Sequence, residues 1–196
     1  REIYKIGRGP SSSHTMGPER AINIMRERYP NADLLKITLY GSLALTGSGH
    51  GTDTVIAKTA APVKCEVSFD AETACPVHPN TMNIEVYENG KAVCAKRVYS
   101  VGGGTVVFEG EKTELIEKYT DDGIYPHNSF AEIAEYCKDK KLRLWQYAEQ
   151  CEGKEITQYL FEVWERMKAT VHEGLTTSGT LPGCLKTQRR AQKLYS

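Results

Sequence analysis

The dipeptide Asn89-Gly90 constrains the fold of this chain more than any other pair of residues. It stands between two segments, 83–88 and 91–99, in which apolar and polar residues alternate. A two-residue type I′ turn needs a positive φ at both positions, and Asn followed by Gly adopts these angles readily. The sequence therefore predicts an antiparallel β-hairpin here.

Three further segments carry strand signals. The segment KITLYGSL (36–43) alternates Ile37 and Leu39 with polar residues, and KCEVSF (64–69) follows the same pattern. A glycine triplet at 102–104 then precedes TVVFEGE (105–111), which predicts an edge or bulged strand. We expect these strands to join the hairpin in one sheet.

Two helices are expected among these strands. Pro18 suits the first turn of a helix that carries Ala21, Ile22, Met25 and Tyr29 on its apolar side and ends at Pro30. The segment LTGSGHGTDT (45–54) predicts a glycine-rich bend that resembles a backbone-amide pocket, with Thr52 or Asp53 capping a short helix over 54–60.

Beyond residue 120 the pattern becomes helical. Ser129 and Glu132 form a capping box, and a second helix fits 141–151. A long amphipathic helix is expected over 156–172. Its expected apolar face consists of Tyr159, Leu160, Val163, Met167, Thr170 and Val171.

This order of elements predicts an α+β fold. We expect a mixed or antiparallel sheet with packed helices in residues 1–120, followed by a helical segment in residues 121–196.

Composition excludes several classes of protein. Hydrophobic residues make up 40% of the 196 and charged residues 26%, and no apolar run is long enough for a membrane span. Lys plus Arg and Asp plus Glu number 25 each, so no net charge attracts nucleic acid or an anionic membrane. The six cysteines form no CxxC pair, which favours reduced thiols in a cytoplasmic protein.

The segment GRGPSSSHTMGP (7–18) is the first candidate site. It places Ser11, Ser12, Ser13 and Thr15 around His14, just before a helix. Hydroxyls and backbone N–H groups at a helix N-terminus can receive a carboxylate or phosphate, and a histidine can transfer a proton near neutral pH. The alternative is an exposed polar linker.

The segment CPVHPNT (75–81) is the second candidate. Cys75 and His78 have zinc-like spacing, but no partner CxxC or HxxxH occurs, so we expect no metal site. His78 is instead a candidate for proton transfer, with Asn80 as a hydrogen-bonding or turn residue. A turn with a solvent-facing histidine is the alternative.

The remaining histidines carry weaker signals. The segment GSGHGTD (47–53) contains His50 but is not GxGxxG, so it predicts a tight turn and no dinucleotide site. His127 precedes a helix cap, and His172 ends the long helix, where a cation suits the helix dipole. No GxSxG occurs, which disfavours a serine hydrolase.

Five ordered blocks of the chain resemble the iron–sulfur-dependent L-serine dehydratases, also called L-serine ammonia-lyases, of bacteria. They are GRGPSSSHTMGPERA (7–21), LYGSLALTGSGHGTD (39–53), HPNTM (78–82), YSVGGG (99–104) and EGLTTSGTLPGCLKTQRRA (173–191). One departure is Cys184, where the family motif has glycine.

The resemblance implies a family organisation and a chemistry. Residues 1–120 correspond to a beta domain, and 121–196 lead into an alpha catalytic domain, so we expect this sequence to be part of a longer polypeptide. A [4Fe–4S] cluster would act as Lewis acid toward the substrate hydroxyl, with its cysteine ligands outside this chain. The implied partners are L-serine, the alpha domain and a second copy in a homodimer, with no nucleic acid or membrane.

The resemblance also implies roles for individual residues. His14 and His78 would be the catalytic acid and base. Ser11, Ser12, Ser13, Thr15 and Asn80 would bind the substrate, and no residue of this chain would bind metal. Two other functions stay open: an amino-acid-sensing regulatory module, and a scaffolding or dimerisation domain.

Overall fold

The computed structural model describes residues 4–7, 11–111, 124–181 and 186–196. The chain divides into two compact units. The sheet unit has residues 7, 11–111, 179–181 and 186–189 as its described part, and the helical unit has 4–6, 124–178 and 190–196.

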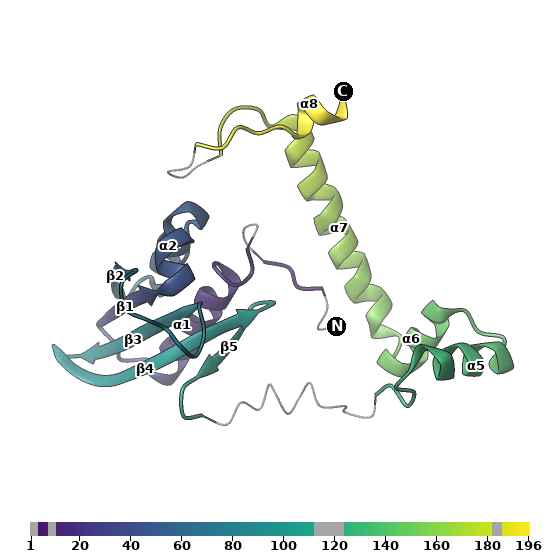
Figure 1. Ribbon diagram of the computed structural model, residues 1–196, viewed down its shortest axis with the longest axis horizontal. Helices are drawn as coiled ribbons and strands as arrows, with labels where there is room; N and C mark the ends of the chain where they lie inside the picture. Colours follow the sequence, from purple (N-terminus) through teal and green to yellow (C-terminus); the bar gives the residue numbers. More distant parts are fainter. Residues whose placement is uncertain (1–3, 8–10, 112–123, 182–185) are drawn as a thin grey trace. The chain divides into compact units, whose positions relative to one another are not determined.

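The sheet unit contains a five-stranded mixed sheet, seen in Figure 1 as the group of arrows. The strands are β1 Leu34–Tyr40, β2 Lys64–Asp70, β3 Thr81–Glu88, β4 Lys91–Gly102 and β5 Thr105–Phe108. Their order is β2-β1-β3-β4-β5; β1 and β2 are parallel, and the other neighbours are antiparallel. The predicted mixed sheet is confirmed.

The hairpin at Asn89-Gly90 joins β3 to β4. Asn89 has φ 51° and Gly90 has φ 73°, so both residues adopt the left-handed conformation that the turn requires. The antiparallel pairing of β3 with β4 confirms the prediction made from this dipeptide.

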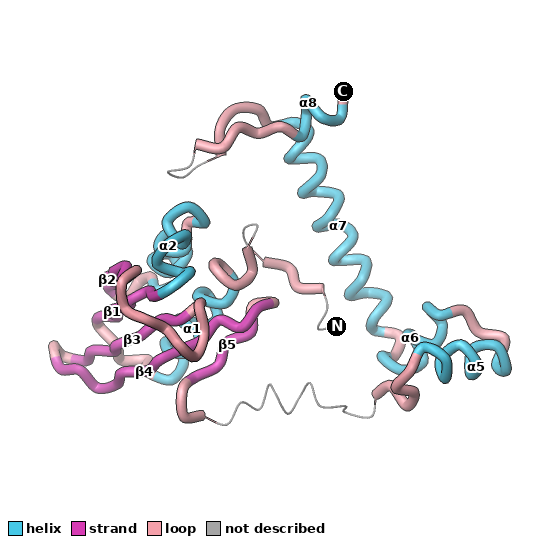
Figure 2. The backbone as a smooth tube through the Cα atoms, viewed as in Figure 1, coloured by secondary structure: helices cyan, strands magenta, loops and turns pink. Residues whose placement is uncertain are grey.

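Three helices of the sheet unit are α1 Met16–Arg28, α2 Gly41–His50 and α3 Thr52–Ala60, which Figure 2 distinguishes in colour from the strands. The core is formed by residues from both kinds of element. Leu35, Ile37 and Leu39 alternate along β1 and are buried together with Ile22 of α1 and Ile56 of α3. The period of two in the strand and the spacing of three to four in the helices place these side chains in one core.

The expected glycine-rich bend at 45–54 is wrong, because the strand ends at Tyr40 and a helix follows at once. Gly41 allows this change of direction with φ 52°, and a Cβ at this position would lie 2.4 Å from the Pro79 carbonyl oxygen. Burial of Leu43 and Gly47 outweighs the low helix propensity of the glycines.

The expected cap of the next helix is also wrong. Gly51, with φ 71°, ends α2 and begins α3, so neither Thr52 nor Asp53 is the N-cap. Thr52 is fully buried inside the first turn, where its hydroxyl donates a hydrogen bond of 2.7 Å to the His14 carbonyl oxygen.

The helical unit contains α5 Phe130–Lys140, α6 Leu144–Glu152, α7 Glu155–Thr176 and α8 Ala191–Tyr195. The predicted capping box of Ser129 and Glu132 is confirmed at the start of α5. The predicted long helix is confirmed as α7, which is longer than expected at both ends. The α+β class predicted for the chain is therefore confirmed.

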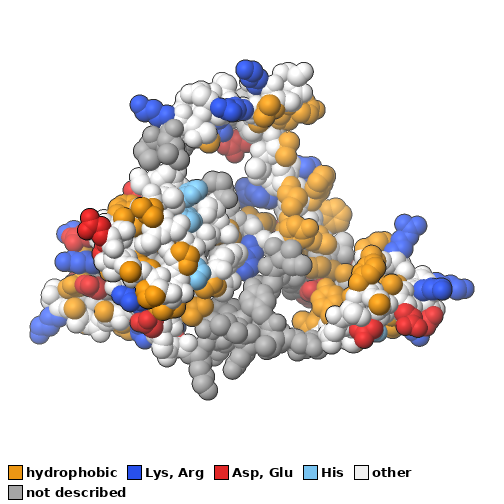
Figure 3. Space-filling view, viewed as in Figure 1, with side chains coloured by type: hydrophobic (Ala, Val, Ile, Leu, Met, Phe, Trp, Pro, Cys, Tyr) orange, Lys and Arg blue, Asp and Glu red, His pale blue; other side chains and the backbone are white. Residues whose placement is uncertain are grey.

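The apolar side of α7 is largely exposed within the described residues. Val163 is buried, whereas Leu160, Met167 and Val171 are exposed. Figure 3 shows hydrophobic side chains along this helix. No helix in the described part of the chain has the length and apolar character needed to cross a membrane.

Candidate active site

The serine-rich segment folds as a tight turn before α1. The Ser11 carbonyl accepts hydrogen bonds from the His14 and Thr15 N–H groups at 3.2 and 3.0 Å, and the Ser12 carbonyl accepts one from Gly17 N–H at 2.9 Å. The Thr15 hydroxyl donates to the Ser11 carbonyl at 2.7 Å. Thr15 is 1% exposed, so its hydroxyl stabilises the turn from inside.

His14 lies in a ring of hydroxyl groups. Its Nδ1 atom is 3.0 Å from Ser11 Oγ and 3.1 Å from Ser13 Oγ. Its Nε2 atom is 3.0 Å from Thr46 Oγ1 and contacts Ser42 through the carbonyl oxygen at 3.3 Å and the hydroxyl at 3.2 Å. Both ring nitrogens therefore have polar partners although the residue is only 7% exposed.

The environment of His14 lowers its pKa. Burial is the largest cause, because it disfavours the charged imidazolium, and the nearby His50 ring acts in the same direction. A hydrogen bond with the Ser42 backbone opposes both effects in part. His14 is consequently a neutral imidazole near neutral pH.

His50 is the residue of this site that the sequence prediction missed. Its ring centroid lies 4.8 Å from that of His14, with an angle of 51° between the planes. Ser42, Thr46 and His50 follow one another at intervals of four residues along α2, which places them on one face of the helix. A helical interpretation of 41–50 would have revealed this row.

The segment around His78 forms a second hydrogen-bonded turn. Asn80 N–H donates to His78 Nδ1 at 3.0 Å, and Thr81 Oγ1 donates to the His78 carbonyl at 2.5 Å. The Asn80 side-chain amide donates to the Ser100 carbonyl at 3.3 Å. The Ser100 N–H donates to the Asn80 carbonyl at 2.9 Å, so this turn is attached to β4.

Ser42 connects the two predicted segments. Its N–H donates to the Pro79 carbonyl at 2.7 Å, while its carbonyl and hydroxyl contact His14. No hydrogen bond or ring contact joins His14 directly to His78 in the part of the chain that the structure describes. The structure thus brings Ser11, Ser13, His14 and His50 together and places the His78 turn beside them through Ser42.

Gly17 and Ser100 make a close contact near this site. A Cβ on Gly17 would lie 2.0 Å from Ser100 Oγ. Ser100 is fully buried, and its hydroxyl has no hydrogen-bond partner among the described residues. Glycine at position 17 therefore allows the first turn of α1 to approach β4.

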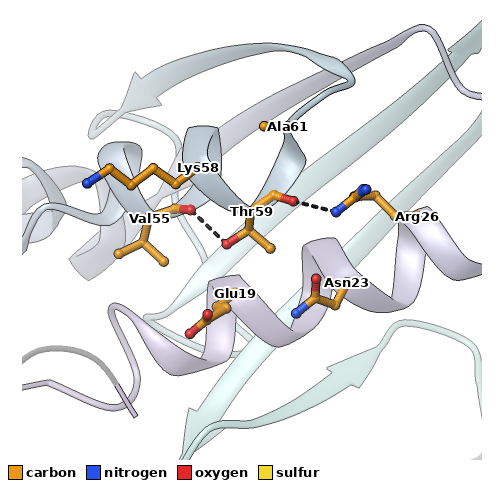
Figure 4. Close-up of a pocket in the computed structure, with 7 residues that line it drawn as sticks. All are labelled: Glu19, Asn23, Arg26, Val55, Lys58, Thr59 and Ala61. Carbon is orange, nitrogen blue, oxygen red and sulfur yellow. Dashed lines mark hydrogen bonds between the residues drawn. The ribbon is translucent and has the colours of Figure 1, made fainter.

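A surface groove of about 300 Å³ lies elsewhere on the sheet unit, between α1 and α3. Figure 4 shows it lined by Glu19, Asn23, Arg26, Val55, Lys58, Thr59 and Ala61. None of the predicted site residues lines this groove. Histidine side chains instead gather on one face of the sheet unit in Figure 3.

The described residues contain no group of three His, Cys, Asp or Glu side chains that could hold a metal ion. Cys65, Cys75, Cys94, Cys137 and Cys151 are free thiols. Burial raises the pKa of Cys65 to about 11, which makes it an unreactive thiol. Cys184 lies outside the described residues, as do 8–10 of the first resembling block.

In comparisons with known proteins, the matching family model and the relatives below all carry serine dehydratase in their names. The family model described as "Serine dehydratase beta chain" matches residues 1–61 and 57–111. "L-serine dehydratase 1" of Escherichia coli (strain K12) is 31% identical, over 98% of this chain and 52% of that protein. "L-serine dehydratase" of Haemophilus influenzae is 32% identical, over 99% and 53%. The "L-serine dehydratase" of Streptomyces coelicolor is 31% identical, over 97% and 52%. The chain spans about half the length of these relatives.

Proposed function

The chain belongs to the serine dehydratase beta chain family, and we propose that it supplies the histidine side of the active site of an L-serine ammonia-lyase. In this reaction L-serine loses its α-proton and its β-hydroxyl group as water. The resulting aminoacrylate then hydrolyses to pyruvate and ammonia. Since the chain spans about half of each relative, we propose that a catalytic domain outside it completes the site.

The observation that carries this proposal is the cluster of hydroxyls around two adjacent imidazoles. Ser11 and Ser13 lie within 3.1 Å of His14, and the His50 ring lies 4.8 Å from the His14 ring. Removal of an α-proton needs a base that is unprotonated near the working pH, and an imidazole whose pKa is lowered by burial meets this requirement. Hydroxyl groups beside it can bind a small polar substrate.

The serines are proposed to bind the substrate. Ser11, Ser12 and Ser13 would contact its carboxylate or ammonium group. Thr15 and Asn80 stabilise the two turns that carry the site. The Thr15 hydroxyl donates a hydrogen bond to the Ser11 carbonyl, and the Asn80 side-chain amide donates one to the Ser100 carbonyl. We therefore assign the loop serines to direct contact, and Thr15 and Asn80 to holding the two turns.

Three histidines are proposed for proton transfer. His78 accepts a hydrogen bond at Nδ1 from Asn80, so its ring proton would lie on Nε2, which can act as a donor. His14 was expected as the second group; because both its ring nitrogens contact protein groups, it would exchange protons with the substrate through a loop serine. Its contact with His50 adds that residue as a candidate base. These assignments distribute acid and base roles over the two turns that Ser42 connects and over α2, which carries His50.

A [4Fe–4S] cluster is part of the proposal, but the described residues do not provide a site for it. They contain no convergent set of metal ligands, and their five free cysteines are scattered among four strands and helices and one loop. We propose that the cluster ligands lie outside this chain. The residues present here would bind the substrate and move protons.

The test is an activity assay on the full-length polypeptide that carries this chain, prepared without oxygen. We expect equal amounts of pyruvate and ammonia from L-serine, and a large loss of turnover when His14→Ala and His78→Ala are combined. His172→Ala, an exposed position on α7, is the control. Normal turnover in the double variant would remove the proposed role of this pair.

A calorimetric experiment separates this proposal from a sensing function. The present chain by itself should bind L-serine weakly, because it provides only part of the site. Tight binding to the isolated chain would contradict the assignment of a half-site.

A further inference from the structure

One neighbour of His14 Nε2 has a fixed hydrogen-bonding role, and a second neighbour is hydrogen-bonded to the first. The Ser42 carbonyl oxygen lies 3.3 Å from Nε2 and can only accept a hydrogen bond. Thr46 Oγ1 lies 3.0 Å from the same nitrogen, and its own proton is directed to the Ser42 carbonyl at 2.9 Å. When its proton lies on the Ser42 carbonyl, Thr46 offers a lone pair to His14. The Ser42 hydroxyl oxygen, 3.2 Å from Nε2, can accept as well, so all three contacts are compatible with a proton on Nε2.

The other ring nitrogen then has the lone pair. Nδ1 faces Ser11 Oγ at 3.0 Å and Ser13 Oγ at 3.1 Å, and the two hydroxyl oxygens are 3.4 Å apart. A single nitrogen lone pair accepts one strong hydrogen bond, so one hydroxyl donates its proton to the ring. The other hydroxyl keeps its proton for a different acceptor.

This arrangement gives the two serines different roles toward a ligand. The hydroxyl that donates to Nδ1 has only lone pairs left and can accept from a ligand N–H. The other hydroxyl can donate to a ligand oxygen. The ammonium and carboxylate groups of an α-amino acid are adjacent on one carbon, so this pair of roles matches them.

We propose that Thr46 and the Ser42 carbonyl fix the tautomer of His14 and thereby make the Ser11 and Ser13 hydroxyls a receptor for an α-amino acid. Thr46 is a positioning residue, because it acts on the ligand through His14 and the serines. His50, on the same face of α2, is the titratable group that faces His14. The identity of the ligand rests on the proposed function, whereas the tautomer is inferred from contacts within this chain.

The tautomer is tested directly by nuclear magnetic resonance on this chain. Long-range correlations between the ring nitrogens and ring protons are recorded at a pH at which His14 is neutral. They should show a large excess of the form protonated at Nε2. The signals are assigned by their loss in His14→Gln. A majority of the form protonated at Nδ1 would overturn the inference.

Two substitutions at one position test the part that Thr46 plays. Thr46 is exposed, so Thr46→Val removes the hydroxyl with little effect on the core. We expect His14 in this variant to shift measurably toward the Nδ1-protonated form, and Thr46→Ser to restore the original ratio. An unchanged ratio in Thr46→Val, with backbone resonances elsewhere preserved, would show that Thr46 does not fix the tautomer.

The ligand assignment is tested on the full-length polypeptide. An analogue of L-serine that lacks the amino group, 3-hydroxypropanoate, should inhibit pyruvate formation with an affinity at least about tenfold below that of L-serine. Equal affinity would overturn the receptor assignment while the tautomer result stands. Absence of any reaction with L-serine would instead refute the proposed function, and the spectra would still decide the tautomer.

Discussion

His14 is a buried polar residue, and its protonation depends on what each ring nitrogen contacts. Hydroxyls from the serine turn surround Nδ1, and α2 provides the partners of Nε2. Such a ring is stable as a neutral group, because burial penalises the imidazolium. The residues that we propose as ligand contacts therefore also influence how the stability of the fold changes with pH.

The stability of the sheet unit should fall as the pH is lowered from neutral through the ordinary histidine pKa of 6.5. The pKa of His14 is lowered in the folded chain by burial, so below pH 6.5 the unfolded chain takes up this proton first. Its contribution is fully present above pH 6.5 and is lost as the pH falls toward the folded pKa. Urea unfolding at a series of pH values measures this dependence.

A His14→Gln variant provides the comparison for the pH series. It should show a smaller loss of stability over the same acidic range, because the titrating group is gone. Identical pH profiles for the variant and the original chain would contradict the assignment to His14.

Gly17 is a residue whose size is limited by its surroundings. Gly17→Ala should lower the free energy of unfolding by about 1–3 kcal/mol, because the new Cβ meets Ser100 Oγ at 2.0 Å and Ser100 Cβ at 2.9 Å. Urea denaturation measures the loss. Adding Ser100→Gly should recover part of it, and no recovery would show that the clash lies elsewhere.

At the scale of elements, α2 shows where sequence reasoning succeeds and where it does not. Strands, the hairpin and the amphipathic helices follow from local periodicity and turn chemistry, which the sequence displays directly. Residues 41–50 contain three glycines and little periodicity, so their helical state depends on burial of Leu43 and Gly47 by the surrounding fold. Because this helix was not predicted, the row of Ser42, Thr46 and His50 on its face was not predicted either.

The serine turn and α3 are joined by one buried hydrogen bond. Thr52→Val should cost about 1–3 kcal/mol of unfolding free energy, because the His14 carbonyl loses its partner of 2.7 Å in a buried site. Thr59→Val is a matched control, since among the described residues the Thr59 hydroxyl bonds only to Val55 of the same helix. Equal shifts of the urea midpoint in both variants would contradict the claim that the hydrogen bond from Thr52 to His14 contributes more to stability than one within a helix.

At the scale of the whole molecule, the chain contains a sheet unit with its own core and a helical unit. All members of the buried core cluster lie between Ala21 and Phe108. The predicted site residues of the serine turn and the His78 turn also belong to this unit. Their proximity through Ser42 required long-range packing, which no local pattern in the sequence could specify.

The sheet unit should therefore fold without the helical unit. A polypeptide of residues 1–111 should give dispersed amide resonances that coincide with those of residues 11–111 in the full chain, because the buried cluster is complete within it. Spectra typical of an unfolded chain would show that residues beyond 111 are needed for this core to form.

The most direct test of the account concerns the pair of rings at the centre of the proposed site. In the full-length polypeptide, His50→Ala should lower kcat/KM for L-serine by about a hundredfold or more, because a positioned base contributes at least that factor. His172→Ala should leave it unchanged. A kcat/KM within about twofold of the original in His50→Ala and also in His14→Ala/His50→Ala would contradict the claim that these imidazoles move the substrate's proton.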